Sequence, residues 1–114
     1  MKIIKLVARD DGLSYFEEFD CGHASKHPLG MYSKKFSTKG VQFRDFEAGA
    51  TFDWHNAPQP QYIIYLEGKV EVKASGGETK VFNPGEVLFA TDLTGKGHIT
   101  TTLTKGRSVV VTTQ

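Results

Sequence analysis

Short runs of β-branched and aromatic residues, each closed by glycine, proline, asparagine or aspartate, restrict the fold of this sequence more than any other feature. Such runs with regular turn signals are typical of strands joined by tight turns. No stretch of about 12 residues has the apolar spacing of an amphipathic helix. The pattern predicts an all-β sandwich or barrel, with strands at residues 2–8, 14–19, 41–46, 51–55, 62–67, 69–74, 79–82, 87–91, 98–104 and 107–113.

Residues 20–40 differ from this pattern. They hold Gly22, Pro28, Gly30 and Gly40 without strand-like alternation, so an irregular arm is expected there. No internal repeat or linker divides the chain, and its 114 residues are expected to form a single domain, residues 1–114.

The charge and the cysteine content indicate which kinds of binding partner and which cellular compartment to expect. Lys and Arg total 14 and Asp and Glu total 13, so a net charge of +1 does not indicate nucleic acid or an anionic membrane as a partner. The lone Cys21 has no cysteine to pair with in the chain, and no run resembles a signal peptide or a membrane helix of roughly 18 apolar residues. A reducing, cytoplasmic environment is expected.

Two segments carry the residues with chemical potential. In the first, five residues separate Gly49 from His55, Gln61 follows six positions after that histidine, and six residues separate Gln61 from Gly68. In the second, His98 follows Gly85 across a glycine-rich stretch.

This spacing resembles that of the cupin family over about residues 41–111. The first cupin motif is Gly, five residues, His, one residue, His, three or four residues, Glu, six residues, Gly. Gly49, His55 and Gly68 match it, whereas Ala57 stands where the second histidine belongs and Gln61 where the glutamate belongs.

The second cupin motif is matched less closely. Gly85 fits its start and His98 fits its histidine, but Thr91 replaces a proline, Thr102 replaces an asparagine, and the loop at residues 92–97 is longer by two. The resemblance implies a double-stranded β-barrel of cupin or jelly-roll type, and a homodimer. The strand expected at Lys2–Ala8 is a candidate for adding to a partner's sheet, because an unpaired edge would otherwise be exposed.

The family also implies a divalent metal at the barrel mouth, here with His55, Gln61 and His98 as ligands. Such a site suits Fe, Mn, Ni, Co, Cu or Zn, and replacing glutamate by glutamine weakens it by one negative charge. Each histidine could instead be an ordinary hydrogen-bonded polar residue. Gln61 could orient His55 through a side-chain hydrogen bond rather than bind the metal.

Strand alternation suggests three further pocket residues. Asp53 shares parity with His55, Tyr65 shares parity with Gln61, and Asp92 opens the glycine-rich loop near the mouth. Phe52 and Trp54 have the opposite parity from His55 and are expected to pack elsewhere. Asp53 could act as a general base or could simply be a polar rim residue. Asp92 could be a turn former and Tyr65 a core residue.

Two functions from different classes follow. The first is a metal-dependent cupin acting on a small organic molecule, as an oxygenase, isomerase or lyase. The second is a metal-free small-molecule-binding or regulatory module that uses the same pocket. The two missing ligands favour the second, and the retained glycines, histidines and Gln61 favour the first.

Overall fold

The computed structural model describes all 114 residues and confirms the all-β prediction, with twelve strands and no helix. No helix capable of crossing a membrane is present. The strands are β1 (Lys2–Ala8), β2 (Ser14–Asp20), β3 (Ser25–His27), β4 (Gly30–Tyr32), β5 (Gly40–Phe46), β6 (Thr51–His55), β7 (Gln61–Glu67), β8 (Val70–Ala74), β9 (Thr79–Phe82), β10 (Val87–Ala90), β11 (His98–Thr102) and β12 (Gly106–Thr112).

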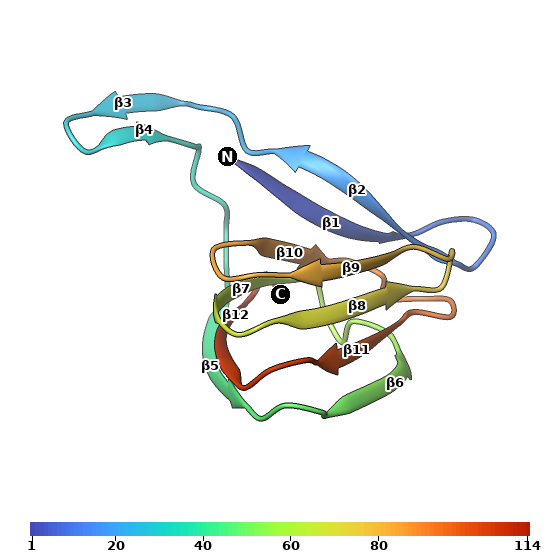
Figure 1. Ribbon diagram of the computed structural model, residues 1–114. Coiled ribbons are helices and arrows are strands. Elements are labelled where there is room, and N and C mark those ends of the chain that lie inside the picture. The colour runs from blue at the N-terminus through green and yellow to red at the C-terminus, as the bar shows by residue number, and fades with distance from the viewer.

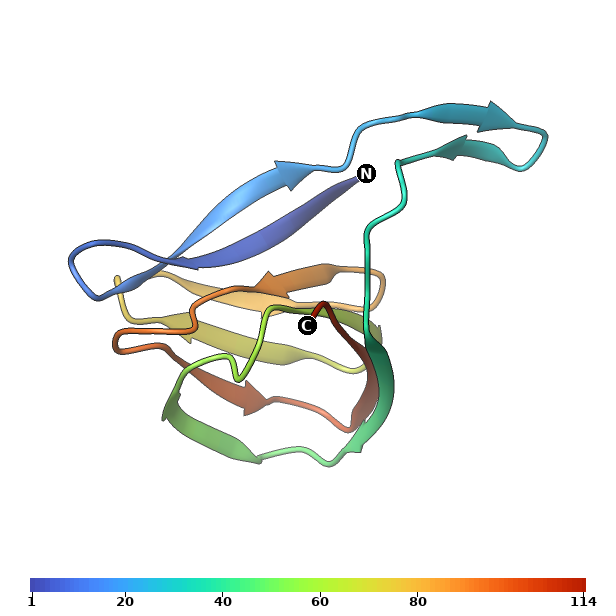
Figure 2. The ribbon, with the colours of Figure 1, turned by 180° about the vertical axis from the view of Figure 1, so that it is seen from behind.

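These strands form two facing sheets and a separate hairpin (Figures 1 and 2). The larger sheet has six strands in the order β2-β1-β10-β7-β12-β5, and the smaller has four in the order β6-β11-β8-β9. All pairings are antiparallel except that of β1 with β10. The β3–β4 hairpin pairs with neither sheet and extends away from the body of the molecule.

The two sheets are not closed into a barrel, which corrects the double-stranded barrel expected from the sequence. The edge strands β5 and β6 share no hydrogen-bonded ladder. Thr102, at the end of β11, holds the turn between these two strands, because its backbone carbonyl accepts from the amide of Gly49 and its hydroxyl donates to the carbonyl of Glu47. The fold is therefore an open two-sheet sandwich of jelly-roll type.

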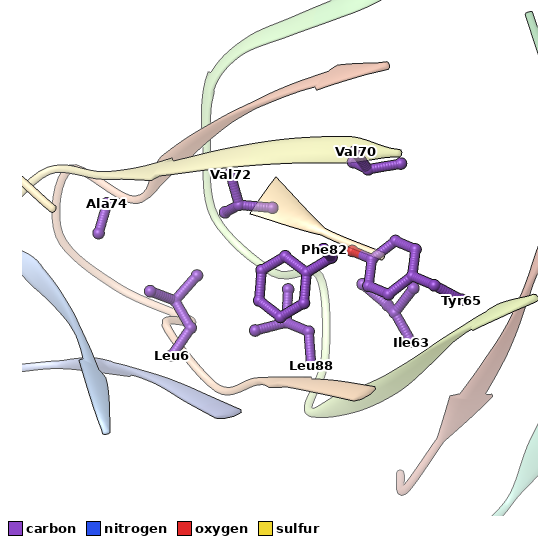
Figure 3. Packing of buried hydrophobic residues seen from close by; sticks show 8 residues of the cluster. All are labelled: Leu6, Ile63, Tyr65, Val70, Val72, Ala74, Phe82 and Leu88. Carbon is purple, nitrogen blue, oxygen red and sulfur yellow. The ribbon is translucent and has the colours of Figure 1, made fainter. Parts of the chain in front are cut away.

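The hydrophobic core lies between the sheets and explains why the strands alternate as they do. Phe82 on β9 stacks on Tyr65 of β7 with ring centroids 5.2 Å apart. Burial of such side chains is the main favourable term in folding. Figure 3 shows the cluster, which consists of Leu6, Ile63, Tyr65, Val70, Val72, Ala74, Phe82 and Leu88.

The N-terminal region departs from two predictions. Strand β1 is paired on both edges within its own sheet, with β2 on one side and β10 on the other. The prediction that Lys2–Ala8 adds to a partner's sheet is therefore wrong. The arm expected to be irregular contains the β3–β4 hairpin, in which every residue is exposed.

Candidate functional site: a polar cavity between the sheets

A cavity of about 190 Å³ opens between the two sheets at the end where β6, β7 and β11 meet. Apolar side chains such as Phe52, Ile63 and Leu88 form part of its wall. Its polar lining comes from both sheets and consists of Arg44, His55, Gln61, Tyr65, His98 and Thr100. Polar and apolar side chains therefore contribute to the lining in comparable number. A concave site with an apolar wall and converging polar groups is the usual form of a small-molecule site.

His98 is the most firmly held of these side chains. It begins β11, is 5% exposed, and lies directly opposite His55 in the β6–β11 ladder. Its Nδ1 lies 2.5 Å from Oδ2 of Asp92. The carboxylate accepts, so Nδ1 donates, and Nε2 is the ring nitrogen left for another partner.

Asp92 lies behind His98 and not at the mouth of the cavity, where the sequence placed it. Its side chain is fully buried, and it is absent from the cavity wall. Oδ2 is bonded to His98, whereas Oδ1 is a buried oxygen without a hydrogen-bond partner. Asp92 therefore does not line the pocket as predicted, and it orients His98 instead.

His55 ends β6 and is oriented in a different way. Its Nδ1 lies 2.8 Å from the carbonyl oxygen of Asp53, which can only accept, so Nδ1 again carries the proton. The ring stacks on Phe52 at 3.7 Å between centroids and lies 4.2 Å from the ring of His98. Burial lowers the pKa of His55, and the neighbouring His98 lowers it further. Both imidazoles therefore present Nε2 as their remaining nitrogen, and His55 favours the neutral form.

A β-bulge in β6 decides which side chains reach the cavity. His98 pairs with His55 and Thr100 pairs with Phe52, so β6 spans the interval with one residue more than β11. The extra residue reverses the alternation, and Phe52 lines the cavity together with His55. The parity argument for Asp53 is accordingly wrong: its side chain is exposed, and its Oδ1 accepts from the amide of Trp54.

Gln61 and Tyr65 both lie on β7 and line the cavity. Gln61 is half-buried and is not the group that orients His55, since the carbonyl of Asp53 occupies Nδ1 of that ring. Tyr65 is 1% exposed and belongs to the core cluster as well as to the cavity wall. Burial raises the pKa of the Tyr65 phenol, and the nearby Arg44 guanidinium acts in the opposite direction, so the phenol stays protonated at neutral pH.

Gly97 lets the glycine-rich loop pass close to His55. Its φ is +78°, and a Cβ built there would lie 2.0 Å from the carbonyl oxygen of His55. No side chain fits in that space, and an L residue rarely adopts that φ. The loop from Asp92 to His98 thus depends on a glycine at the point where it meets β6.

Arg44 is a cavity residue that the sequence did not reveal. It projects from β5, is half-buried, and its Nε donates to the buried Ser108 hydroxyl at 2.9 Å. Residues 41–46 alternate without a clear apolar face, since Phe43 and Phe46 fall on opposite sides. The sequence therefore gave no signal that Arg44, and not the 80% exposed Phe43, points inward.

The donor groups fit a transition metal better than a hard cation. Two imidazole nitrogens and the Gln61 amide oxygen line one cavity, and imidazole suits Zn, Cu, Fe and Ni. A buried carboxylate bonded to a histidine is the usual outer support of such a ligand, as Asp92 is to His98. No group of three His, Cys, Asp or Glu side chains converges anywhere in the chain, so Gln61 would be needed to complete a set of three.

Comparisons with known proteins extend to the fold alone. No protein-family model and no curated protein matches the sequence. Among solved structures, the conserved SPY1581 protein of unknown function from Streptococcus pyogenes superposes with a TM-score of 0.56 at 15% identity, over 72% of this chain and 69% of that one. The "putative ethanolamine utilization protein q" of Salmonella typhimurium LT2 covers 98% of this chain and 94% of its own, at 17% identity and a TM-score of 0.42. The first likeness supports the all-β, two-sheet architecture of this chain.

Proposed function

We propose that this chain is a small cupin-like protein whose cavity holds a divalent transition metal and a small organic ligand. His55, His98 and Gln61 are the proposed ligands. The observation that carries the proposal is the pairing of two imidazoles on adjacent strands, each with Nδ1 occupied by an oxygen acceptor. This fixes both rings and leaves Nε2 of each for a shared partner.

The metal would supply Lewis acidity toward a carbonyl or enolate oxygen, as in an oxygenase, isomerase or lyase. The protein's own part is to bind, orient and desolvate. His55 and Gln61 are neutral ligands, and the apolar wall formed by Phe52, Ile63 and Leu88 limits water around the ligand. With no carboxylate in direct contact with the metal, binding is weaker than in a site that has one.

A metal-free binding module is the second candidate. Ala57, which is buried and lines the cavity, and the neutral Gln61 stand where the family pattern has a histidine and a glutamate. In this version Nε2 of His55 and of His98 would hydrogen-bond the organic ligand directly. The same cavity and the same side chains serve both candidates, which differ only in the metal.

Metal analysis of untagged protein, followed by calorimetric titration with Zn²⁺, Co²⁺ and Ni²⁺, separates the two. We expect one equivalent of metal, lost in His55→Ala and in His98→Ala, and bound at least tenfold more tightly, about 1.4 kcal/mol, by Gln61→Glu. Gln42→Glu is the matched control, because it adds the same charge at an exposed site on β5 outside the cavity wall. If neither the parent protein nor Gln61→Glu binds a metal, the metal proposal is wrong and the metal-free binding module is the remaining candidate.

A further inference from the structure

We propose that the cavity takes a short-chain carboxylate and that the Arg44 guanidinium binds its carboxylate group. The inference rests on the cavity being a ligand site, as proposed above, but it does not require the metal. Arg44, on the sheet opposite the two histidines, would then determine specificity for a carboxylate.

The guanidinium is positioned in advance for this role. Ser108, which is 1% exposed, takes the Nε hydrogen through its hydroxyl, and the Phe46 ring lies 5.6 Å from the guanidinium carbon. These contacts help to fix the plane of the group, and the buried Tyr65 phenol lies within hydrogen-bonding reach of the guanidinium. No carboxylate of the chain forms an ion pair with it. Two parallel N–H donors at fixed spacing match the two oxygens of a carboxylate.

No acidic side chain of the chain neutralises Arg44. The structure contains five ion pairs, and Arg44 belongs to none of them. Asp92 is committed to His98, and the neighbouring Asp45 and Asp53 are exposed and form no ion pair. An anionic ligand would stabilise this half-buried cation, which has no counter-ion in the chain. Charged hydrogen bonds are stronger where the groups are partly removed from water.

The size and lining of the cavity restrict the rest of the ligand. A volume of about 190 Å³ corresponds to roughly six water molecules at about 30 Å³ each. Arg44 comes from β5 of the six-stranded sheet, whereas His55 and His98 come from the four-stranded one. A molecule that spans the cavity therefore has a carboxylate at one end, a short carbon chain against the apolar wall, and a hydroxyl or oxo group that reaches the imidazoles.

Titration of ¹⁵N-labelled, chelator-treated protein with lactate tests the proposal, with its uncharged amide, lactamide, as the matched ligand. The Arg44 Nε–H signal and the histidine ring signals report binding at the two ends of the cavity. We expect saturable binding of lactate that shifts both sets of signals, and at least tenfold weaker binding of lactamide. Pyruvate with pyruvamide, and inorganic phosphate, complete the panel.

Substitutions of Arg44 test whether lactate binding depends on this residue. Arg44→Gln should weaken lactate binding at least tenfold, and Arg44→Lys, which keeps the charge but not the fork, should weaken it less. Arg107→Gln is the control, because Arg107 is an exposed arginine paired with Glu67. The backbone amide spectrum of each variant shows whether the fold is kept, and should Arg44→Gln unfold, Arg44→Lys and the lactamide comparison still decide.

Four results would overturn the inference: equal binding of lactate and lactamide, equal losses in Arg44→Gln and Arg107→Gln, phosphate binding as tight as lactate binding, or no carboxylate binding with and without Zn²⁺. The metal is judged separately. If the protein takes up no Zn²⁺ but binds lactate in a way that depends on Arg44, the metal proposal is wrong and the carboxylate proposal stands. If it takes up Zn²⁺ but does not bind lactate through Arg44, only the carboxylate proposal is wrong.

Discussion

At the scale of single residues, the Asp92–His98 pair is the strongest chemical feature of the molecule. Asp92 is a fully buried carboxylate with one oxygen unpartnered. Burying a charge is costly unless a positive group or a metal compensates it. The side chain that hydrogen-bonds to this carboxylate is His98, which also lines the cavity. A cation bound at the Nε2 side of His98 would therefore interact with the charge of Asp92 through the imidazole ring.

Asp92→Asn tests whether the negative charge of Asp92 strengthens metal binding by His98. The amide oxygen can still accept from Nδ1 of His98, so the ring keeps its orientation while the negative charge is lost. We expect metal affinity to fall about 10- to 100-fold, the usual effect of removing such a supporting carboxylate, as measured by calorimetry. Asp53→Asn, which removes an exposed carboxylate close in sequence to His55, should change nothing. Unchanged affinity in Asp92→Asn would show that His98 needs no charged support.

His55 predicts a pH dependence of stability. Burial lowers its pKa in the folded state below the ordinary value of about 6.5, so the unfolded chain takes up the proton first as the pH falls. The resulting contribution to stability is present in full above about pH 6.5 and is lost as the pH falls through the folded-state pKa. Urea unfolding from pH 7.5 downward should show this loss, and His55→Gln should remove it. An NMR midpoint for the His55 ring at or above 6.5 would contradict the prediction.

At the scale of elements, the contact between the glycine-rich loop and β6 sets the geometry of the cavity. Gly97 lies against the carbonyl of His55, and its own carbonyl accepts from the Ser14 hydroxyl at 2.7 Å. The loop is therefore fixed to β6 on one side and to the start of β2 on the other. His98 follows directly, so any shift of the loop moves a proposed ligand.

Gly97→Ala should destabilise the protein and misplace His55. A Cβ there would overlap the His55 carbonyl and would add the strain of a positive φ, which together should cost about 2 kcal/mol or more. Gly12→Ala is the matched control, because Gly12 has a φ of +80° and open space around its Cβ position. Urea unfolding should show a larger loss in the free energy of unfolding for Gly97→Ala than for Gly12→Ala. Equal losses would mean that the loop can move to accommodate the Cβ without destabilising the protein.

Local sequence signals predicted the elements well and the orientation of individual side chains poorly. Ten of the strands lie within two residues of the runs that predicted them, because turn residues and β-branched runs act locally. The β3–β4 hairpin was missed, since its residues are exposed and show no alternation. Closure into a barrel was wrongly predicted, because whether β5 and β6 form a ladder depends on long-range geometry.

The candidate site shows the same division. Motif spacing singled out His55, Gln61 and His98, and all three line one cavity. The bulge in β6 carries no glycine or proline, so nothing in the sequence signalled that Phe52 rather than Asp53 faces inward. The link between Asp92 and His98 depends on the path of a loop, and the inward turn of Arg44 depends on the packing of β5. Neither can be obtained from strand periodicity.

At the scale of the whole molecule, charge and apolar surface are unevenly distributed. Because β2 includes Asp20, the arm in the structure is residues 21–40. It holds four lysines and no acidic residue, whereas the rest of the chain has ten basic and thirteen acidic residues and a net charge of −3. The arm also exposes Leu29, Met31 and Tyr32, at 91%, 50% and 46%. At its base, an apolar hollow of about 310 Å³ lies on the six-stranded sheet, bordered by Ile3, Phe36 and Tyr62.

We propose that this arm contacts a second copy of the chain. A two-stranded hairpin alone is at best marginally stable in water, and the β3–β4 hairpin has no support from its own sheets (Figure 1). The basic arm of one copy is complementary in charge to the acidic body of another. The apolar hollow at the arm's base would let the arm's exposed apolar side chains leave water. Reciprocal exchange of two such arms gives a closed two-fold dimer.

Light scattering should therefore find a dimer at micromolar concentration, and Leu29→Glu with Met31→Glu should convert it to a monomer. Both residues are exposed, so the substitutions leave the core unchanged and the circular dichroism spectrum should stay that of a β protein. Phe43→Glu is the control, because it places a negative charge on an 80% exposed apolar residue of β5, outside the arm. Dissociation by Phe43→Glu but not by the arm variants would place the interface on β5. A monomeric parent protein would show that the arm does not contact a second copy.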